Sequence, residues 1–169
     1  MRRAMDFEMA VCEVLNQYCH PRQVKHFFVA ISWLGDGKAW YLIMLTLPLL
    51  YGERGLGTSW SMAKVALVNL VFYKVIKRIS SRQRPCAVSS AIRLGTAPLD
   101  QYSFPSGHTM HAVAFFMVAT ADHPELTCVL LPFSVLVAIS RVVLGLHYPT
   151  DVIAGGLIGG YVASLMLAA

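Results

Sequence analysis

The chain has 169 residues, of which 56% are hydrophobic and only 14% are charged, whereas a typical soluble protein carries roughly 25% charged residues. A soluble domain of this length could not bury so much apolar surface in one core, so we expect a single integral-membrane domain over residues 1–169. The net charge of +5 is spread among apolar segments, which excludes nucleic acid as the expected partner and favours anionic headgroups or a phosphorylated ligand.

The first predicted element is a helix over residues 4–19. Apolar residues such as Phe7, Val14 and Tyr18 recur at helical spacing, with polar residues between them. This pattern predicts an amphipathic helix on the membrane surface or against the remaining helices, and the sequence leaves both placements open.

Six apolar segments follow, separated by compact turn signals. They cover residues 26–34, 39–51, 61–79, 106–122, 126–146 and 151–169. Several are shorter than the ~20 apolar residues that span a bilayer, although polar end-turns or local thinning of the bilayer can compensate. We therefore predict an all-α fold, a six-helix transmembrane bundle with an amphipathic interfacial helix at its N-terminus.

Two glycine pairs lie four residues apart on the last segment, Gly155-Gly156 and Gly159-Gly160. This spacing permits close helix packing in membranes. The glycines are equally consistent with the general abundance of this residue in membrane helices.

Three polar clusters interrupt the apolar segments. Ser140-Arg141, His147 and Asp151 interrupt the otherwise apolar stretch from Leu126 to Ala169, where charged groups are costly and usually functional. The other two clusters consist of Lys77 with Arg84-Pro85 and of Pro105-Ser106-Gly107-His108. Because successive membrane helices alternate in direction, all three clusters should meet at one membrane face.

The residue types in these clusters suit a phosphate group. Lys77, Arg84 and Arg141 supply cations, and the arginines can bind oxygens in pairs. Ser106 and the amide of Gly107 stand at a predicted helix start, where free N–H groups and the macrodipole favour an anion. Charge stabilisation of this kind accounts for most of the catalysis in phosphoryl transfer.

Together the three stretches, Lys77-x6-Arg84-Pro85, Pro105-Ser106-Gly107-His108 and Ser140-Arg141-x5-His147-x3-Asp151, resemble the signature of the type 2 phosphatidic acid phosphatase (PAP2) superfamily. The resemblance covers residues 77–151 and implies a lipid phosphatase that needs no metal or other cofactor. It implies that His147 is the nucleophile, and that His108 protonates the leaving group and then activates water. Asp151 would hold the other ring nitrogen of His147 and so fix the tautomer.

The resemblance leaves the lipid open. The expected substrate is a phosphomonoester or diphosphate of a membrane lipid, of the phosphatidate or phosphatidylglycerophosphate type. Undecaprenyl diphosphate hydrolysis, lipid A dephosphorylation and phosphotransfer to another lipid are the alternatives within the family. The oligomeric state is not predicted.

Other classes of function fit the sequence less well. A metal-dependent hydrolase would use His108, His111, His147 and Asp151 as ligands, but the three cations would repel a divalent ion and the chain has no HExxH pattern. A polytopic anion transporter would usually show internal repeats or broken helices, which are not evident. Haloperoxidases of the same superfamily share the anion cage but are soluble.

For a bacterial cell the resemblance implies an inner-membrane protein with an extracytoplasmic active site. With six spans and a cytoplasmic N-terminus, the distribution of basic residues does not by itself support that orientation. It does so only if Lys77, Arg84 and Arg141 bind ligand.

Overall fold

The structure is a computed structural model that describes residues 2–168, in which helices are connected by turns and loops without any β-strand. This confirms the predicted all-α class. In chain order the elements are α1 (Arg2–Gln17), α2 (Arg22–Trp33), the π-helix η1 (Leu34–Lys38), α3 (Ala39–Ser80), α4 (Pro85–Val88), α5 (Gly107–Asp122), the 3-10 helix η2 (Pro124–Leu126), α6 (Thr127–Val143) and α7 (Pro149–Ala168).

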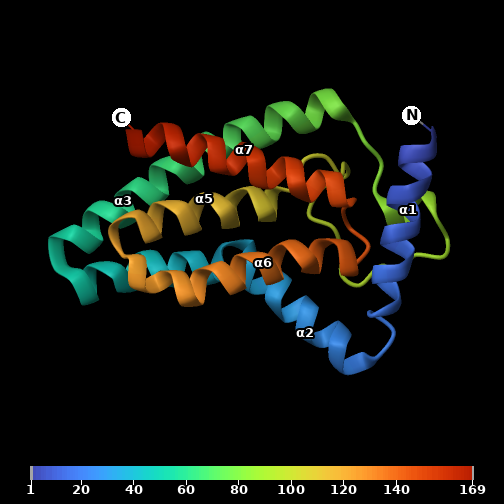
Figure 1. Ribbon diagram of the computed structural model, residues 1–169, viewed down its shortest axis with the longest axis horizontal. Coiled ribbons are helices and arrows are strands. Elements are labelled where there is room, and N and C mark those ends of the chain that lie inside the picture. The colour runs from blue at the N-terminus through green and yellow to red at the C-terminus, as the bar shows by residue number, and fades with distance from the viewer. Residues whose placement is uncertain (1, 169) are drawn as a thin grey trace.

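Residues 22–51 form one kinked pass along the bundle, not the predicted pair of helices joined by a turn (Figure 1). The chain bends at Asp36 and Gly37, whose torsions are non-helical, and then continues in the same general direction. Side-chain contacts with α6 follow in antiparallel order: Ser32 with Arg141, Gly35 beside Val137, and Trp40 with Phe133. The glycines therefore permit a kink here, with Gly37 at a φ of 101°, and the two short predicted segments join into one long crossing.

The true reversal lies at Gly52, within α3. This glycine has φ 59° and ψ −135°, and across the turn Ser59 Oγ donates a hydrogen bond to the carbonyl of Met44 at 2.7 Å. Helix resumes immediately afterwards, so the next crossing begins near residue 53 and not at residue 61 as predicted. Within residues 2–168 the chain thus makes five passes along the bundle instead of six.

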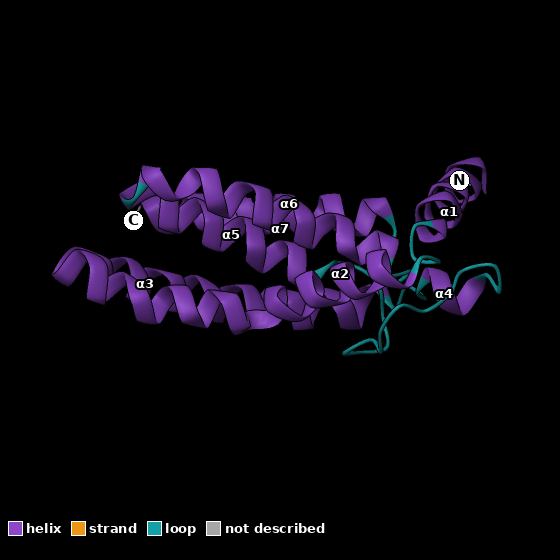
Figure 2. Ribbon diagram, turned by 90° about the horizontal axis from the view of Figure 1, so that it is seen from below, coloured by secondary structure: helices purple, strands orange, loops and turns teal. Residues whose placement is uncertain are grey.

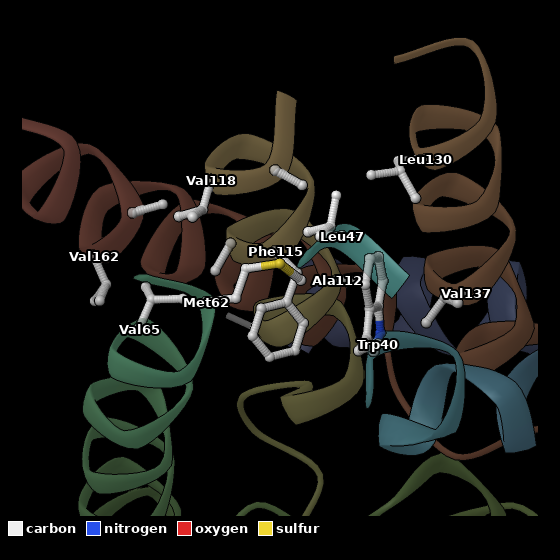
Figure 3. Packing of buried hydrophobic residues seen from close by; sticks show 13 residues of the cluster. Trp40, Leu47, Met62, Val65, Ala112, Phe115, Val118, Leu130, Val137 and Val162 are labelled. Carbon is white, nitrogen blue, oxygen red and sulfur yellow. The ribbon is translucent and has the colours of Figure 1, made fainter. Parts of the chain in front are cut away.

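The helices pack in two layers around a continuous apolar core. Figure 2 shows α5, α6 and α7 together on one side and α3 on the other, with α1 and the loops at one end. Trp40 is fully buried at the centre, and its ring lies 5.3 Å from the rings of both Phe115 and Phe133 (Figure 3). This core holds the two layers in fixed register and so positions the helix ends that carry the polar clusters.

Helices α5 and α7 pack closely through two of the four glycines. A Cβ added to Gly155 would lie 2.5 Å from the carbonyl oxygen of Ser106, and one added to Gly159 would overlap the carbonyl oxygen of Met110. At Gly156 and Gly160 the same atom would make only ordinary contacts. The close-packing interpretation of the glycine pairs therefore holds for one member of each pair.

The outer surface of the bundle suits lipid as its solvent. Three helical stretches are long and apolar enough to cross a membrane, Arg22–Val88, Pro124–Val143 and Pro149–Ala168. Large apolar side chains such as Leu45, Leu49 and Leu157 are at least 70% exposed, which would be unfavourable in water. The chain is an integral membrane protein.

Helix α1 lies across the end of the bundle. Its buried residue Asn16 donates a hydrogen bond to the carbonyl of Val143 at 2.8 Å, while Phe7 and Val14 on another face, and Tyr18 just after the helix, are exposed. The helix thus packs against the protein and also presents an apolar stripe. That this stripe contacts the bilayer surface stays a prediction.

Candidate active site

The end of α6 places His147 through a left-handed turn. Gly145 has a φ of 74°, which a glycine adopts without steric cost, and its amide bonds to the carbonyl of Val142 at 2.9 Å. After this turn, the amide of His147 donates a hydrogen bond to the carbonyl of Arg141 at 3.1 Å. Arg141 and His147, six positions apart in the sequence, are thereby held at the same end of the bundle.

Lys77 and Arg84 come together at the end of α3 and the loop after it. Both are almost fully buried, and both donate to the Oδ1 atom of Asp100, Arg84 Nη2 at 2.8 Å. Arg84 Nη1 also lies 3.3 Å from His147 Nε2 and 2.7 Å from the carbonyl oxygen of Leu146. The Arg84 guanidinium thus links the first polar cluster to the third.

Asp100 lies on the long loop between α4 and α5 and was not identified from the sequence. Its carboxylate accepts hydrogen bonds from Tyr73, Lys77 and Arg84. Although burial favours the neutral acid, the hydrogen bonds from Lys77 and Tyr73 hold the pKa of Asp100 below its usual value. A carboxylate therefore occupies the position between two of the cations that were predicted to bind phosphate.

Arg141 enters the site from α6 and is 3% exposed. One of its terminal nitrogens donates to Ser32 Oγ, while its buried Nε has no hydrogen-bond partner among residues 2–168. A buried guanidinium N–H without an acceptor is costly, and a bound anion would satisfy it.

His147 and Asp151 face one another without a formed hydrogen bond. His147 Nδ1 lies 3.7 Å from Asp151 Oδ2, and this nitrogen has no partner within the described residues. Catalytic hydrogen bonds are often this long in ligand-free structures. Burial, followed by the charges of Arg141 and Arg84, holds the pKa of His147 well below its usual value, so its imidazole is neutral at pH 7.

Arg82 supports Asp151 from the side away from the histidine. Its Nη1 donates to Asp151 Oδ1 at 2.6 Å, and its Nη2 donates to Glu8 Oε2 of α1 at 2.8 Å. The guanidinium also stacks 3.9 Å from the centre of the Tyr148 ring. Neither residue was predicted as part of the site: from the sequence Arg82 could contact a headgroup or simply be solvated, and Glu8 was only one of the acidic residues of the first helix.

The start of α5 brings Ser106, Gly107 and His108 to the same end of the bundle. The amide of Ser106 donates to the carbonyl of Asp151 at 2.9 Å, while its hydroxyl lies 3.0 Å from that of Thr109. A Cβ added to Gly107 would lie 2.5 Å from the Tyr73 ring, so this glycine admits the tyrosine that bonds to Asp100. All eight predicted site residues from the three polar clusters therefore lie at this end of the bundle.

His108 Nε2 lies 3.5 Å from Asp36 Oδ1, at the kink between α2 and α3. Asp36 was interpreted from the sequence only as part of a turn. His111, one helical turn beyond His108, is engaged elsewhere, because its Nδ1 lies 3.0 Å from the carbonyl oxygen of Gly107.

Comparison with known proteins agrees with this geometry. The model of the PAP2 superfamily matches residues 58–169, which include all three polar clusters. A lipid A 1-phosphatase of Rhizobium johnstonii is 29% identical over 165 residues, covering 86% of this chain and 67% of the relative. A decaprenylphosphoryl-5-phosphoribose phosphatase of Mycolicibacterium smegmatis is 40% identical over 83 residues, but this match covers only 48% of this chain and 43% of the relative.

The fold is also similar to that of a solved structure. The crystal structure of LpxE from Aquifex aeolicus superimposes with a TM-score of 0.81, covering 95% of this chain and 94% of that one at 24% identity.

Proposed function

This chain belongs to the PAP2 superfamily, and from that premise we propose that it hydrolyses the phosphomonoester or diphosphate of a membrane lipid through a phosphohistidine. The observation that carries the proposal is the arrangement around His147 Nε2. Arg84 lies 3.3 Å from that nitrogen, and Lys77 and Arg84 both donate to the carboxylate of Asp100.

In the binding step the phosphate takes the place of the Asp100 carboxylate. Lys77 and Arg84 then exchange one anion for another, and the unpaired Nε of Arg141 gains an acceptor. Three fixed cations around the phosphate stabilise the negative charge that spreads over its oxygens in the transition state.

In the first chemical step His147 Nε2 attacks phosphorus, and the bond from phosphorus to the lipid oxygen breaks. The neutral imidazole supported by its pKa shift is the nucleophilic form. His108, protonated, donates its proton to the departing oxygen, and Asp36 at 3.5 Å stabilises that charged form.

In the second step His108, now neutral, accepts a proton from water, and the resulting hydroxide attacks the phosphohistidine. The P–N bond breaks, orthophosphate leaves, and His147 becomes neutral again. Asp151 balances the charge of His147 while it is phosphorylated, and Arg82, at 2.6 Å from Asp151, keeps that carboxylate ionised and oriented.

This scheme requires no metal ion, because Lys77, Arg84 and Arg141 supply the positive charge. Residues 2–168 contain no group of three or more histidine, cysteine, aspartate or glutamate side chains positioned to hold one. We expect full activity in excess chelator.

The substrate that we propose is a lipid of the phosphatidate or phosphatidylglycerophosphate type, with polyprenyl diphosphates and lipid A as the alternatives to be compared. A relative is named as a lipid A 1-phosphatase and another as a phosphatase of a decaprenyl-linked sugar phosphate, so the family core accommodates different headgroups. The site faces the extracytoplasmic side of the inner membrane in this proposal.

The test is phosphate release by the purified protein in detergent, measured against phosphatidate, phosphatidylglycerophosphate, undecaprenyl diphosphate and lipid A. Radiolabelled phosphate should be trapped as an acid-labile, base-stable phosphoenzyme. His147→Ala should abolish both turnover and the phosphoenzyme, while His111→Ala should retain most of both. Turnover by His147→Ala at the wild-type rate would remove the phosphohistidine from the mechanism.

A further inference from the structure

A second basic site lies at the same end of the bundle, outside the catalytic cage. It is a cavity of about 320 Å³ between the turn that joins α1 to α2 and the loop after α4. Its lining residues are Cys19, His20, Arg22, Lys25, His26, Arg93, Leu94 and Gly95. Three permanent cations and two histidines thus face one small space, and the lining contains no acidic residue.

The basic side chains around the cavity differ in their pairing from those of the catalytic site. Within residues 2–168 none of the five basic side chains forms an ion pair, whereas Lys77, Arg82 and Arg84 at the catalytic site all do. Unpaired like charges repel one another when they are held close together. An anionic ligand would relieve this repulsion.

The floor of the cavity is fixed by the fold. The buried side chain of Asn16 donates to the carbonyl of Arg93 at 2.9 Å and accepts from its amide at 2.8 Å. The amide of Gly95 bonds to the carbonyl of Leu144 at 3.1 Å, and a Cβ at Gly95 would overlap the Leu144 side chain. The loop is therefore held in place, and Arg93 is presented to the cavity by a rigid support.

Backbone donors add to the side chains. Helix α2 begins at Arg22, at the edge of the cavity, and its preceding residue, Pro21, provides no side-chain cap. The first amides of a helix have no intrahelical acceptor and favour an anion.

Helix α2 runs from the edge of the cavity to the catalytic site. Arg22 is ten residues before Ser32, which bonds to Arg141, and ten residues of helix span about 15 Å. This separation is too large for one phosphate to touch both sites, but it suits two anionic groups at the membrane surface.

We propose that this cavity binds a second lipid phosphate, while the first phosphate occupies the cage around His147. The phosphate belongs either to the same large headgroup or to an anionic phospholipid packed beside the substrate. The chemistry is the same in both cases, because a phosphate ester fills a space lined by arginine, lysine and histidine side chains. The kinetic part of this proposal depends on the proposed lipid phosphatase function, and the binding part does not.

The test compares Lys25→Gln/Arg93→Gln with Arg54→Gln/Lys64→Gln, which also removes one lysine and one arginine, both at exposed positions outside the cavity. Native mass spectrometry of the detergent-solubilised protein should show retained phosphatidylglycerol in preference to phosphatidylcholine. The ratio of retained phosphatidylglycerol to retained phosphatidylcholine should fall about tenfold in the cavity variant and stay unchanged in the control variant. Equal retention by wild type and the cavity variant would overturn the proposal.

A kinetic arm distinguishes the source of the phosphate. The assay uses a diphosphorylated disaccharide lipid in neutral detergent. If the second phosphate is on the substrate, the KM of the cavity variant for this lipid should be about tenfold higher than that of wild type, with kcat unchanged. The KM for the monophosphorylated form of the lipid should then be the same in both proteins. If a neighbouring lipid supplies it, the variant should instead lose the stimulation of wild type by added phosphatidylglycerol. A variant that matches wild type in both assays contradicts the site, whereas an inactive wild type that still retains phosphatidylglycerol contradicts only the phosphatase function.

Discussion

Among single residues, Asp100 is the main difference between the site predicted from the sequence and the site in the structure. The predicted cage consists of cations, yet two of its cations are already bound to a carboxylate. The lowered pKa of Asp100 keeps this carboxylate charged at neutral pH. In the proposed binding step, phosphate competes with this carboxylate for Lys77 and Arg84.

We therefore expect Asp100→Asn to bind anions more tightly. The amide keeps the shape of the side chain and removes its charge, so Lys77 and Arg84 become available to phosphate. The inhibition constant of orthophosphate should fall about tenfold, which corresponds to about 1.4 kcal/mol. Product-inhibition kinetics would measure this, with Asp6→Asn on the exposed face of α1 as the control. Weaker inhibition would mean that Asp100 orients the two cations instead of competing for them.

The sequence predicted the site residues because charged groups among apolar segments are conspicuous and because successive passes alternate in direction. Lys77, Arg84, Ser106, Arg141 and His147 could be grouped on these grounds alone. Asp100 and Glu8 could not, since one lies on a long polar loop and the other on a helix with several similar acids. Only the folded chain places them against Lys77 and Arg82.

At the scale of elements, the contact between α5 and α7 holds two of the three polar clusters together. Ser106 at the start of α5 bonds to the backbone of Asp151 at the start of α7, and the glycines of α7 allow this close approach. The helices can approach only where a glycine faces the partner backbone.

Gly159→Ala should therefore separate the two helices, because its new Cβ would overlap the Met110 carbonyl oxygen. We expect a loss of about 1–3 kcal/mol in stability, typical of overpacking, and a lower thermal midpoint in detergent. Gly160→Ala, whose Cβ would lie 3.5 Å from Met117 Sδ, should have little effect and serves as the control. If both variants melt at the same temperature as wild type, α5 and α7 do not pack as described.

At the scale of the whole molecule, the kinked first pass changes which end of the bundle each basic residue occupies. Two short apolar segments flanking Gly35-Asp36-Gly37 are compatible with either a hairpin or a kink, so the sequence could not decide between them. The kink brings α1 and the start of α2 to the catalytic end, opposite the turn at Gly52.

This arrangement concentrates positive charge at the catalytic end. That end holds Arg2 and Arg3 of α1 together with Arg22, Lys25, Lys77, Arg78, Arg82, Arg84, Arg93 and Arg141, while Arg54 lies at the other. Counted without regard to function, these residues favour a cytoplasmic catalytic end, contrary to the proposed orientation. Four of them, however, belong to the proposed phosphate cage and its supporting network, and three line the proposed second anion site. Arg2, Arg3 and Arg78 then remain at the catalytic end, against Arg54 at the other, so these basic residues still do not by themselves support the proposed orientation.

Cysteine labelling of intact cells tests both the five passes and the orientation. In a variant without its four native cysteines, single cysteines would replace Gln23, Ser90 and Glu53, all exposed. Five passes place residue 23 on the same side as residue 90 and opposite residue 53, whereas six would pair residue 23 with residue 53. We expect a membrane-impermeant maleimide to label the cysteines at positions 23 and 90 from outside, and that at position 53 only after the cells are opened. Labelling of position 53 alone would agree with five passes but would place the catalytic end in the cytoplasm. Labelling of position 90 without position 23 would instead indicate six passes, with a hairpin at Gly35-Asp36-Gly37.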